Sequence, residues 1–549
     1  MHTWKKTIAL ILCLVMVLAV TACGDSGNAN SGSSSSKNEG GESSDDAGDT
    51  GEKDYSEKMV ISWAGIQIDD TKDYNYGDEL TRHFTEKFNI EWDITSLTFE
   101  NWAERLRIWI NSDDMPDMAV WNYLHGEAAN YVDQDLVKQL PDNWKSQWPS
   151  LASAYSDTIM NEGVEEIFDG TYFLFRPVFS NNRPAEKLST HMSAYVRTDW
   201  AEAVGYEVKD VMKTSELMEL AYLFKENDPG NVAEQFGSFY PINMTSAKIS
   251  YFVQFNSTYS GVTSLPYYLG DDGAYQWGPA SEDTLTGLKI MSELYTEGLL
   301  HPEFYTIQDP DDYAMFHTTG QSGIYVGEGM AAWFTRHKQN FAEYQGLDFD
   351  EVVKLVTVVG EDGYYHGSPV TNYWCTNIFS PHIEDAKLER ILDMLDYSCT
   401  EEAQLIIRMG FEDVDWESDG EGGYVSLLET GTSASDKYAI FPMYGNMFIL
   451  SDDFQFINPG FAQNHRDLVK ELYLTREANS TEKSLPSEPD WTVFFHESTA
   501  LNLATMVYTD EYANLVTKEG DIEANWQAWV NEKMNLIQPV LDELNAKIS

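Results

Sequence analysis

Carboxylates and one His-Glu-Ser run are the residue types here that could support acid–base or nucleophilic chemistry. Asp113, Asp114 and Asp117 cluster in one short stretch, and glycoside hydrolysis uses two carboxylates at a fixed separation. They flank a proline, so we interpret them as a solvated turn and a strand start. The run 495–498 (FHES) holds His, Glu and Ser, but triad members are seldom sequence neighbours. Without a GxSxG or phosphate-loop pattern, we predict no enzymatic activity.

Aromatic side chains outside helical or strand periodicity form a second set that could do chemistry. The chain has 16 Trp and 31 Tyr, more than a core requires. Flat rings stack on the C–H faces of sugars, while amides, carboxylates and Arg pair with hydroxyl groups. The residues predicted to bind a ligand are Trp63, Trp121, Asn122, Arg176, Trp277, Trp333, Arg336 and Trp374. The strongest candidates are Trp121, Trp333 and Trp374, and core packing is the alternative for each member.

The stretch 100–122 shows best how the fold positions such residues. Apolar residues recur at helical spacing over 100–111, which predicts an amphipathic helix. The run 118–121 (MAVW) is apolar without alternation, as in a strand covered on both faces. Open α/β sheets place ligands at strand ends, where Trp121 and Asn122 stand. By contrast, helical stripes predict core positions for Trp102, Trp109, Trp526 and Trp529.

Neighbouring segments extend this pattern into an α/β fold. Strands are predicted at 59–63 and 90–94 with a helix between them, so the order is strand–helix–strand–helix–strand. Short links in that order predict a parallel, doubly wound sheet. Further along, Ser281 and Thr214 are predicted to cap helices, and the last helix should break near Pro539. Trp277 lies between Gly and Pro residues, which predicts a loop.

The N-terminus predicts export. Lys5 and Lys6 precede an apolar run at 7–20 that is short for a membrane span. The small residues before Cys23 resemble the lipobox of bacterial lipoproteins, which implies cleavage after residue 22 and lipidation of Cys23. Residues 24–58 are Gly, Ser, Asn and acid, a composition typical of a disordered tether. As a coil that segment spans roughly 30–35 Å.

Charge and cysteine content exclude several classes. The formal charge of −55 repels nucleic acid and anionic lipid. Two cysteines, Cys375 and Cys399, remain after residue 23, so the body is no disulfide scaffold, and free thiols are favoured over a pair. No Cys/His cluster has metal-site spacing, so we predict neither a metal nor a cofactor. The body from about residue 59 is too long for one ordinary domain and suggests two lobes.

Seven segments, in order, carry a resemblance to a known family. They are FTEKFNIEWDI with INSDDMPDMAVWN (84–122), YVDQDLVKQLPDNW (131–144), DGTYFLFRP (169–177), MSAYVRTDWAEAVGY (192–206), SEDTLTGLKIMSELYTEGLLHPEF (281–304), SGIYVGEGMAAWF (322–334) and ERILDMLDYSCTEEAQLIIRMGFEDVDW (389–416). Together they resemble family 1 extracellular solute-binding proteins, the receptors of ABC importers for sugars and oligosaccharides.

The resemblance implies a bilobed, periplasmic-binding-protein-like fold: two doubly wound α/β lobes joined by a hinge of several crossings, with a helix-rich second lobe. We expect lobe 1 at 59–190 plus 331–385 and lobe 2 at 191–330 plus 386–549. The crossings are expected near 179–194, near 326–334 and within 375–390. The implied function is capture of an oligosaccharide between the lobes, hinge closure, and delivery to an ABC permease by a monomer anchored outside the cytoplasm.

Two matters stay open at this point. Related lipoproteins often carry an EF-hand-like calcium loop after the helix at 215–225, but residues 227–234 (NDPGNVAE) have lost most of its alternating oxygen ligands, so we predict no calcium. The alternative functions are binding of a peptide or other non-sugar solute by the same fold and, less favoured, an exported glycan-active enzyme. An anionic glycan would need Arg176 or Arg336 as its partner.

Overall fold

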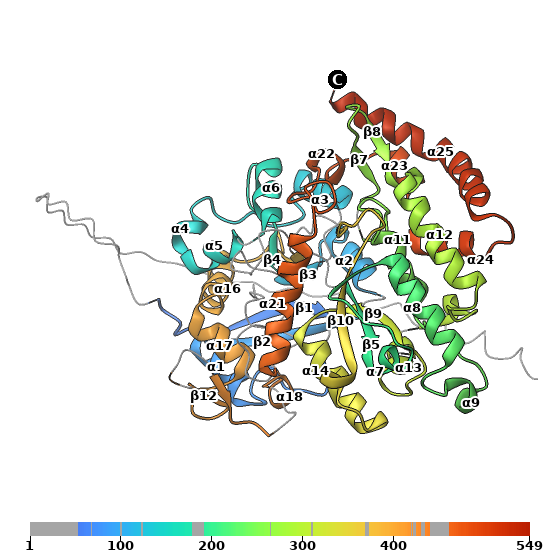
Figure 1. Cartoon of the computed structure of the whole chain (residues 1–549). Helices are drawn as coiled ribbons and strands as arrows, with labels where there is room; N and C mark the ends of the chain where they lie inside the picture. Colours follow the sequence, from blue (N-terminus) through green and yellow to red (C-terminus); the bar gives the residue numbers. More distant parts are fainter. Residues whose placement is uncertain are drawn as a thin grey trace, which may run out of the picture. The chain divides into compact units, whose positions relative to one another are not determined.

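Two mixed β-sheets and two large hydrophobic cores organise the computed structural model of the chain (Figure 1). Helices and short strands alternate, so the mixed α/β class is confirmed. The structure describes residues 53–548 without positions 67, 99–100, 122–124, 157, 178–191, 264, 309–310, 368–372, 419, 421–423, 430–433 and 440–460. None of the described helices combines the length and apolar character that a membrane span requires.

The first sheet has the strand order β2-β1-β3-β11-β4. Its strands β1 (Met59–Ile66), β2 (Ile90–Leu97) and β3 (Met118–Trp121) are parallel, which confirms the prediction for this part. The other two, β11 (Tyr373–Phe379) and β4 (Leu174–Pro177), complete the sheet, with β11 antiparallel to both of its neighbours. All four residues of β3 are buried, as its unbroken apolar run predicted.

Helices cover the first sheet through apolar stripes. α2 (Trp102–Asn111) buries Trp102, Leu106 and Ile110, which recur at helical spacing. α16 (Asp385–Ser398) packs on α5 (Pro149–Tyr155) and joins the same core. The other elements of this part are α1 (Glu79–Lys87), α3 (His125–Asp133), α4 (Trp144–Gln147), α6 (Ile159–Phe168), α17 (Glu401–Met409), β12 (Trp416–Ser418), β13 (Tyr424–Ser426) and α18 (Ala434–Lys437).

The second sheet has the order β6-β10-β5-β9. Its strands are β5 (Met192–Arg197), β6 (Val211–Lys213), β9 (Ile324–Glu328) and β10 (Val353–Val359). β6 and β10 are parallel, whereas β5 is antiparallel to both β9 and β10. The second sheet is therefore mixed, and its short strands carry fewer parallel pairs than the first sheet.

Four long helices contribute many of the buried residues of the second core. α8 (Thr214–Asn227), α12 (Glu282–Thr296), α24 (Tyr508–Thr517) and α25 (Ile522–Lys547) gather around it, with α12 in contact with the other three (Figure 1). The Ser281 hydroxyl accepts a hydrogen bond from the Thr284 N–H, which confirms the predicted cap. The α8 helix also forms where predicted, but Lys213, not Thr214, is its N-cap residue.

The predicted break of the last helix is wrong, because α25 runs through Pro539. Proline removes one backbone hydrogen bond from a helix interior. Val540, Leu541 and Leu544 are buried beyond it. Their burial keeps the helix on the core, so tertiary packing overrides the local preference here.

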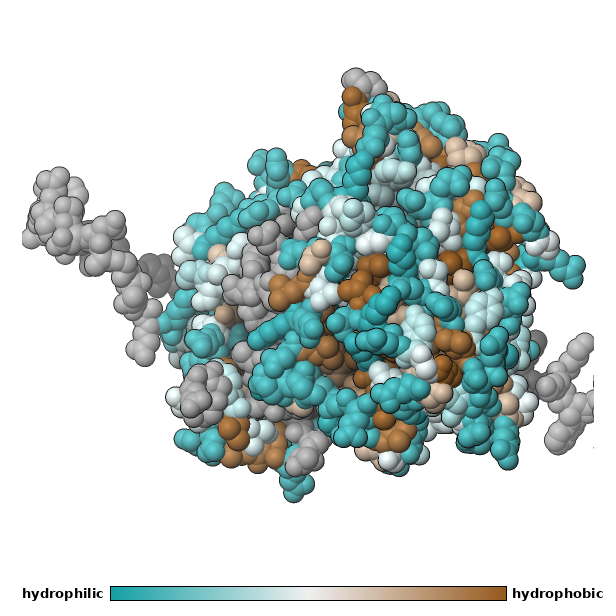
Figure 2. Space-filling model, in the orientation of Figure 1, coloured by the Kyte–Doolittle hydropathy of each residue, from teal (hydrophilic) through white to brown (hydrophobic). Residues whose placement is uncertain are grey.

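The remaining elements of the second part are short except for one helix at Gln463–Ala478, and Phe494 of the helix Trp491–Phe494 belongs to the first core. They are α7 (Thr198–Ala203), α9 (Val232–Phe236), α10 (Ser246–Ile249), α11 (Tyr251–Gln254), β7 (Tyr267–Leu269), β8 (Tyr275–Trp277), η1 (Gly278–Ala280), η2 (Phe304–Thr306), α13 (Asp311–His317), α14 (Ala331–Asn340), η3 (Phe341–Gln345), α15 (Phe349–Val352), α21 (Gln463–Ala478), α22 (Trp491–Phe494) and α23 (Thr499–Ala504). On the face drawn in Figure 2, hydrophilic residues predominate and smaller apolar patches lie between them, as the acidic composition predicts.

Sheet and core membership differs from the predicted lobe boundaries in two places. The block 331–385 was expected in lobe 1, yet α14 and β10 belong to the second core and sheet. The block 386–549 was expected in lobe 2, yet α16 packs on the first core. The chain therefore returns to the first sheet between β10 and β11, not near 326–334. Elements beyond 375–390, α17 and α18 among them, still contribute to the first core, as does Phe494 of α22. A continuous apolar strand such as β10 fits either sheet, so its sequence could not decide this.

Candidate functional site

Two sets of strand ends frame the region in which the candidate residues lie. In the first sheet β1 and β3 end, and β11 begins, at one edge, which therefore includes Trp121 and Tyr373. In the second sheet β5 begins and β9 and β10 end at one edge, which includes Met192 and Glu328. The chain passes between these edges twice, from β4 to β5 and from β10 to β11. Both passages leave from strand ends, where α/β sheets place ligands.

Trp121 ends β3 with its side chain in the first core. Only 1% of it is exposed. Its ring centroid lies 5.5 Å from that of Tyr131 and 5.6 Å from that of Phe173, both in tilted contacts. The side chain thus forms the buried base of the strand-end edge, and this structure offers none of its faces to a ligand. Its predicted neighbour Asn122 lies outside the described residues.

Trp63 is also fully buried, and its environment is unusual. Its indole lies across Gly65, where an added Cβ would come within 2.1 Å of the ring. Any side chain at Gly65 would therefore displace the indole. The Trp63 Nε1 donor has no hydrogen-bond partner in the part of the chain that the structure describes. Such a donor costs about 1–3 kcal/mol of stability.

Arg176 and the backbone of Trp374 both lie beside an irregularity in the pairing of β4 with β11. The pairing of β11 with β4 shifts register between Tyr373 and Thr376, and Cys375 at the bulge has a φ of +54°. The guanidinium of Arg176 interacts with the Cys375 thiol, and burial lowers the Arg176 pKa and raises the Cys375 pKa to about 11. Arg176 is therefore engaged within its own sheet. The Trp374 side chain lies outside the described residues.

Trp333 and Arg336 form an aromatic–cationic surface together with Tyr313, and we call these three residues the α13–α14 platform. The Trp333 and Tyr313 ring centroids are 5.4 Å apart in a T-shaped contact. The Arg336 guanidinium carbon lies 5.2 Å from the Trp333 centroid and 5.0 Å from the Tyr313 centroid. Trp333 and Tyr313 are half-buried and Arg336 is exposed, so rings and charge remain open to a ligand.

Buried polar groups support the platform from below. Lys248 Nζ lies 2.7 Å from Asp312 Oδ2 and donates to the Tyr325 hydroxyl at 2.8 Å. The same ammonium is 5.5 Å from the Tyr313 ring centroid. Asp312 is completely buried, and Lys248 nearly so. The ion pair thus fixes the start of α13, and with it the position of Tyr313.

Two histidines complete this support. His317 Nδ1 and His337 Nδ1 are 2.9 Å apart, and the His337 ring lies 6.0 Å from the Trp333 ring. Burial lowers the pKa of His317 to about 4 and lowers the pKa of His337 well below its usual value. Both rings are therefore neutral near pH 7. One Nδ1 donates to the other, which joins α13 to α14.

Trp277 is a core residue, and the predicted loop is instead β8 followed by a 3-10 turn. Its indole N–H donates to the Tyr508 hydroxyl at 3.0 Å, and its ring lies 5.1 Å from that of Trp529. Only 4% of the side chain is exposed. The Gly and Pro of this segment shape the turn after the strand, and Trp277 packs among helices α24 and α25.

The residues weighed for catalysis have structural roles. His382 lies 2.7 Å from Asp113, and Asp117 accepts hydrogen bonds from Ser62 and Lys387. In the run 495–498, both Glu543 and Ser498 approach the same His496 nitrogen, Nε2, at 3.0 and 3.5 Å. A catalytic triad needs the acid and the hydroxyl on opposite nitrogens of the ring. This arrangement therefore does not activate Ser498, whose hydroxyl caps α23.

The loop compared with a calcium site serves as a helix junction. Asp228 is left-handed (φ 42°) and ends α8. Its two carboxylate oxygens accept hydrogen bonds from the Val232 and Ala233 amides, so they start α9. Within the described ranges no three His, Cys, Asp or Glu side chains are grouped so as to hold a metal ion.

Sequence reasoning missed Tyr313, which joins Trp333 and Arg336. The segment 311–317 (DDYAMFH) reads as a polar start and an apolar helix, and no periodicity separates Tyr313 from a core residue. Tyr313 meets Trp333 and Arg336 only because α13 lies against α14. This is a tertiary contact, and the local sequence pattern of neither helix predicts it. Cys375 and Cys399 are both thiols and are not joined in a disulfide, as the sequence favoured; Cys375 is buried and Cys399 is half-buried.

Comparison with known proteins supports the fold directly. No family model matches the chain, and no curated protein matches it. Among solved structures, an HMO-binding solute-binding protein associated with an ABC transporter of Bifidobacterium longum infantis is 14% identical, with a TM-score of 0.62 over 89% of this chain and 98% of its own. The substrate-binding protein FusA of an S. pneumoniae ABC transporter, in complex with kestose, is 15% identical, with a TM-score of 0.62 over 89% and 98%.

The alginate-binding protein AlgQ2 is 14% identical, with a TM-score of 0.60 over 90% of this chain and 98% of its own. These likenesses extend over nearly the whole of each solved structure. They show that the chain has the bilobed α/β fold of extracellular solute-binding proteins. The predicted fold class is confirmed.

Proposed function

We propose that this protein is an extracytoplasmic receptor that captures a carbohydrate, an oligosaccharide in particular, and delivers it to an ABC importer. The observation that carries the proposal is the α13–α14 platform: two aromatic rings and a guanidinium left open on a fold of this class. Aromatic faces stack on sugar C–H groups, and Arg donates to hydroxyl groups. The similar structures bind HMO, kestose and alginate.

The mechanism follows from the two strand-end edges. The α14 helix begins shortly after β9 ends at the second of these edges, and in the proposed mechanism a ligand seated on the platform also contacts the first sheet. Contacts made to both parts stabilise the closed form over the open form, which shifts the population toward closure. The importer then recognises the closed receptor. Binding of this kind requires no chemical step, which agrees with the structural roles of the acids and of His496.

The proposal also covers how the protein is attached to the membrane and whether its ligand is charged. The lipobox-like segment before Cys23 supports a lipid anchor outside the cytoplasm, with the receptor acting as a monomer. Labelling with a fatty-acid analogue, lost in Cys23→Ser, tests the anchor. A neutral glycan is favoured, because Arg176 is engaged with Cys375 and Arg336 is one cation in an acidic chain.

The first experiment measures thermal stability of the full chain against a panel of oligosaccharides. A ligand that binds only the native state stabilises it by ~2.7 kcal/mol at a hundredfold excess over Kd. We expect a shift with one glycan class that Trp333→Ala abolishes. Tyr305→Ala is the matched control, since Tyr305 is half exposed but outside the platform. A shift with peptides or other solutes, and none with any sugar, would overturn the carbohydrate assignment.

A further inference from the structure

A second concave site lies in the part of the chain that holds the second core. The groove has a volume of about 1070 Å³, and its walls come from four segments, 257–259, 268–283, 362–366 and 481–486. None of the three platform residues lines it. Small-molecule sites commonly have volumes of about 300–1000 Å³. The groove is thus large enough for a ligand of its own.

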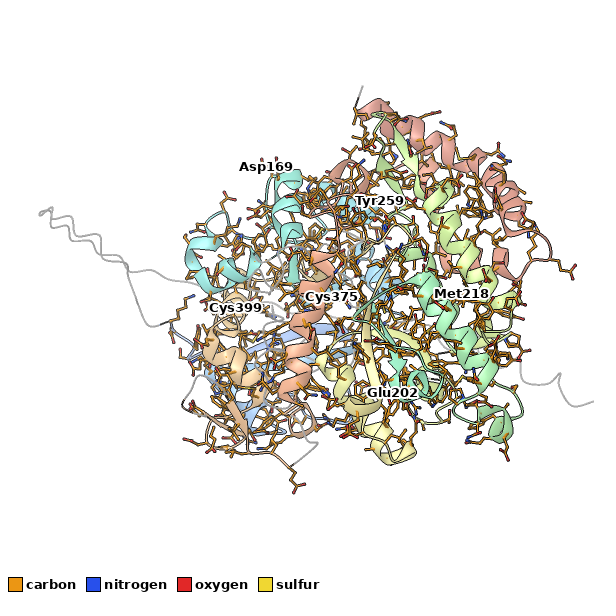
Figure 3. All side chains as sticks on the ribbon, in the orientation of Figure 1. Asp169, Glu202, Met218, Tyr259, Cys375 and Cys399 are labelled. Atoms are coloured by element: carbon orange, nitrogen blue, oxygen red, sulfur yellow. The ribbon has the colours of Figure 1, made fainter. Side chains whose placement is uncertain are left out.

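One wall of the groove is aromatic. The rings of Tyr259 and Tyr268 are stacked, with centroids 4.7 Å apart and planes inclined by 14°. The Tyr268 hydroxyl donates to Gln276 Oε1 at 2.9 Å. Burial raises the pKa of Tyr259 to about 12, so its hydroxyl stays neutral at pH 7. Figure 3 labels Tyr259 on the segment beside β7. The pair presents electron-rich rings to the groove.

Four aspartates also line the groove, and three of them are engaged. Asp271 is paired with Lys483 at 2.7 Å, and Asp362 with His366 at 3.1 Å. Asp272 accepts a hydrogen bond from the Ala274 amide. Glu482, the fifth acid of the groove, accepts hydrogen bonds from Ser487, so Asp283 is the acid that remains.

Asp283 is the carboxylate that is free to receive a ligand. It lies in the first turn of α12, and no hydrogen bond or ion pair joins its side chain to any described residue. Asp283 is exposed, and the partial desolvation that it meets in the groove raises its pKa, with His366 opposing the effect and Asp362 adding to it. A cation beside Asp283 would lower the pKa of this carboxyl, because an opposite charge stabilises its ionised form.

We propose that this groove binds an organic cation in which an ammonium group is attached to a ring, as in an amino sugar. The ammonium pairs with Asp283, and the ring body lies against Tyr259 and Tyr268. Charge-assisted hydrogen bonds and cation–π contacts both favour such a ligand over its neutral counterpart. The site is separate from the platform, so its occupant need not be the transported glycan.

Calorimetric titration of the full chain with glucosamine tests the proposal, with glucose and N-acetylglucosamine as neutral counterparts. We expect glucosamine to bind, and Asp283→Asn to weaken it at least tenfold. Glu282→Gln is the matched control, because it removes the neighbouring exposed charge outside the groove. Trp333→Ala should leave glucosamine binding unchanged, which separates this site from the proposed glycan site.

Two results would overturn the proposal. One is equal affinity for glucosamine and glucose, and the other is full affinity in Asp283→Asn. If Asp283→Asn lowers the unfolding midpoint, Tyr268→Leu provides the second test. It removes the aromatic surface and should weaken glucosamine several-fold; unchanged affinity in that variant would also refute the site.

Discussion

Replacing Lys248 by methionine should strongly destabilise the second core, because it removes the ammonium that faces the buried Asp312 carboxylate. The Nζ–Oδ2 distance is 2.7 Å. At an effective dielectric constant of about 20, two unit charges at that distance attract by ~6 kcal/mol. Each buried ion also loses several kcal/mol of hydration, so the pair is far from a net gain of that size.

The expected loss can be estimated from these opposing effects. Removing one partner of a buried pair typically costs about 3–5 kcal/mol, since the remaining charge keeps its desolvation penalty. Methionine matches the lysine stem in volume, so little of the loss comes from a cavity. The double variant Lys248→Met/Asp312→Asn removes the stranded charge and should recover at least half of the loss.

These free energies are measured by urea unfolding of the unchanged protein, Lys248→Met and the double variant, with tryptophan fluorescence as the signal. Ligand binding gives a second readout, because the pair holds the start of α13 and thus Tyr313. Lys248→Met should weaken glycan binding even where the protein remains folded. A loss below 1 kcal/mol in Lys248→Met, or a double variant less stable than the single one, would refute the account of the ion pair.

Three further predictions concern other buried groups. The free energy of unfolding should fall by up to ~3 kcal/mol as the pH drops from 6.5 to 4. Burial lowers the His317 pKa to about 4 in the folded chain, so the unfolded chain takes up the proton more readily over this range. Unfolding measured at a series of pH values should show a smaller fall in His317→Gln. Trp277→Phe should lower stability by about 1–3 kcal/mol, as it loses the bond to Tyr508 and some packing, while calorimetry should find glycan affinity unchanged; a loss of affinity would return Trp277 to the binding site. Cys375 should resist alkylation at pH 8 until the chain unfolds, since it is buried and its pKa is raised to about 11, whereas half-buried Cys399 should react faster; peptide mapping by mass spectrometry that shows equal labelling would contradict this.

Local patterns predicted the fold where one periodicity dominated. The unbroken apolar run of β3 predicts only a buried strand, and the apolar stripe on α2 predicts only an amphipathic helix. Both elements form as expected. The strand β10 is equally apolar, but its sheet is decided by pairing with β5 and β6, and a sequence does not state its partner. Pro539 illustrates the same limit, because burial of the residues beyond it outweighs the proline.

The binding site was predictable to a smaller extent. Residue type singled out Trp63, Trp121, Trp277 and Trp333 alike, yet the first three are at most 4% exposed. A tryptophan at the end of a strand can turn into the core or away from it, and that choice depends on what lies beneath the strand. Trp333 stays half-buried instead of entering the core, because its ring packs against the rings of Tyr313 and His337.

Rigid support is what turns these surface rings into a binding platform. Exposed aromatic side chains lose rotamer freedom when a ligand orders them, at a cost of about 0.5–1.5 kcal/mol each. Here the T-shaped contact with Tyr313 and the Arg336 guanidinium hold the Trp333 ring before any ligand arrives. Beneath them, the Lys248–Asp312 pair fixes α13. Under the proposed function, the buried charges contribute to affinity through preorganisation, although none of them needs to touch the ligand.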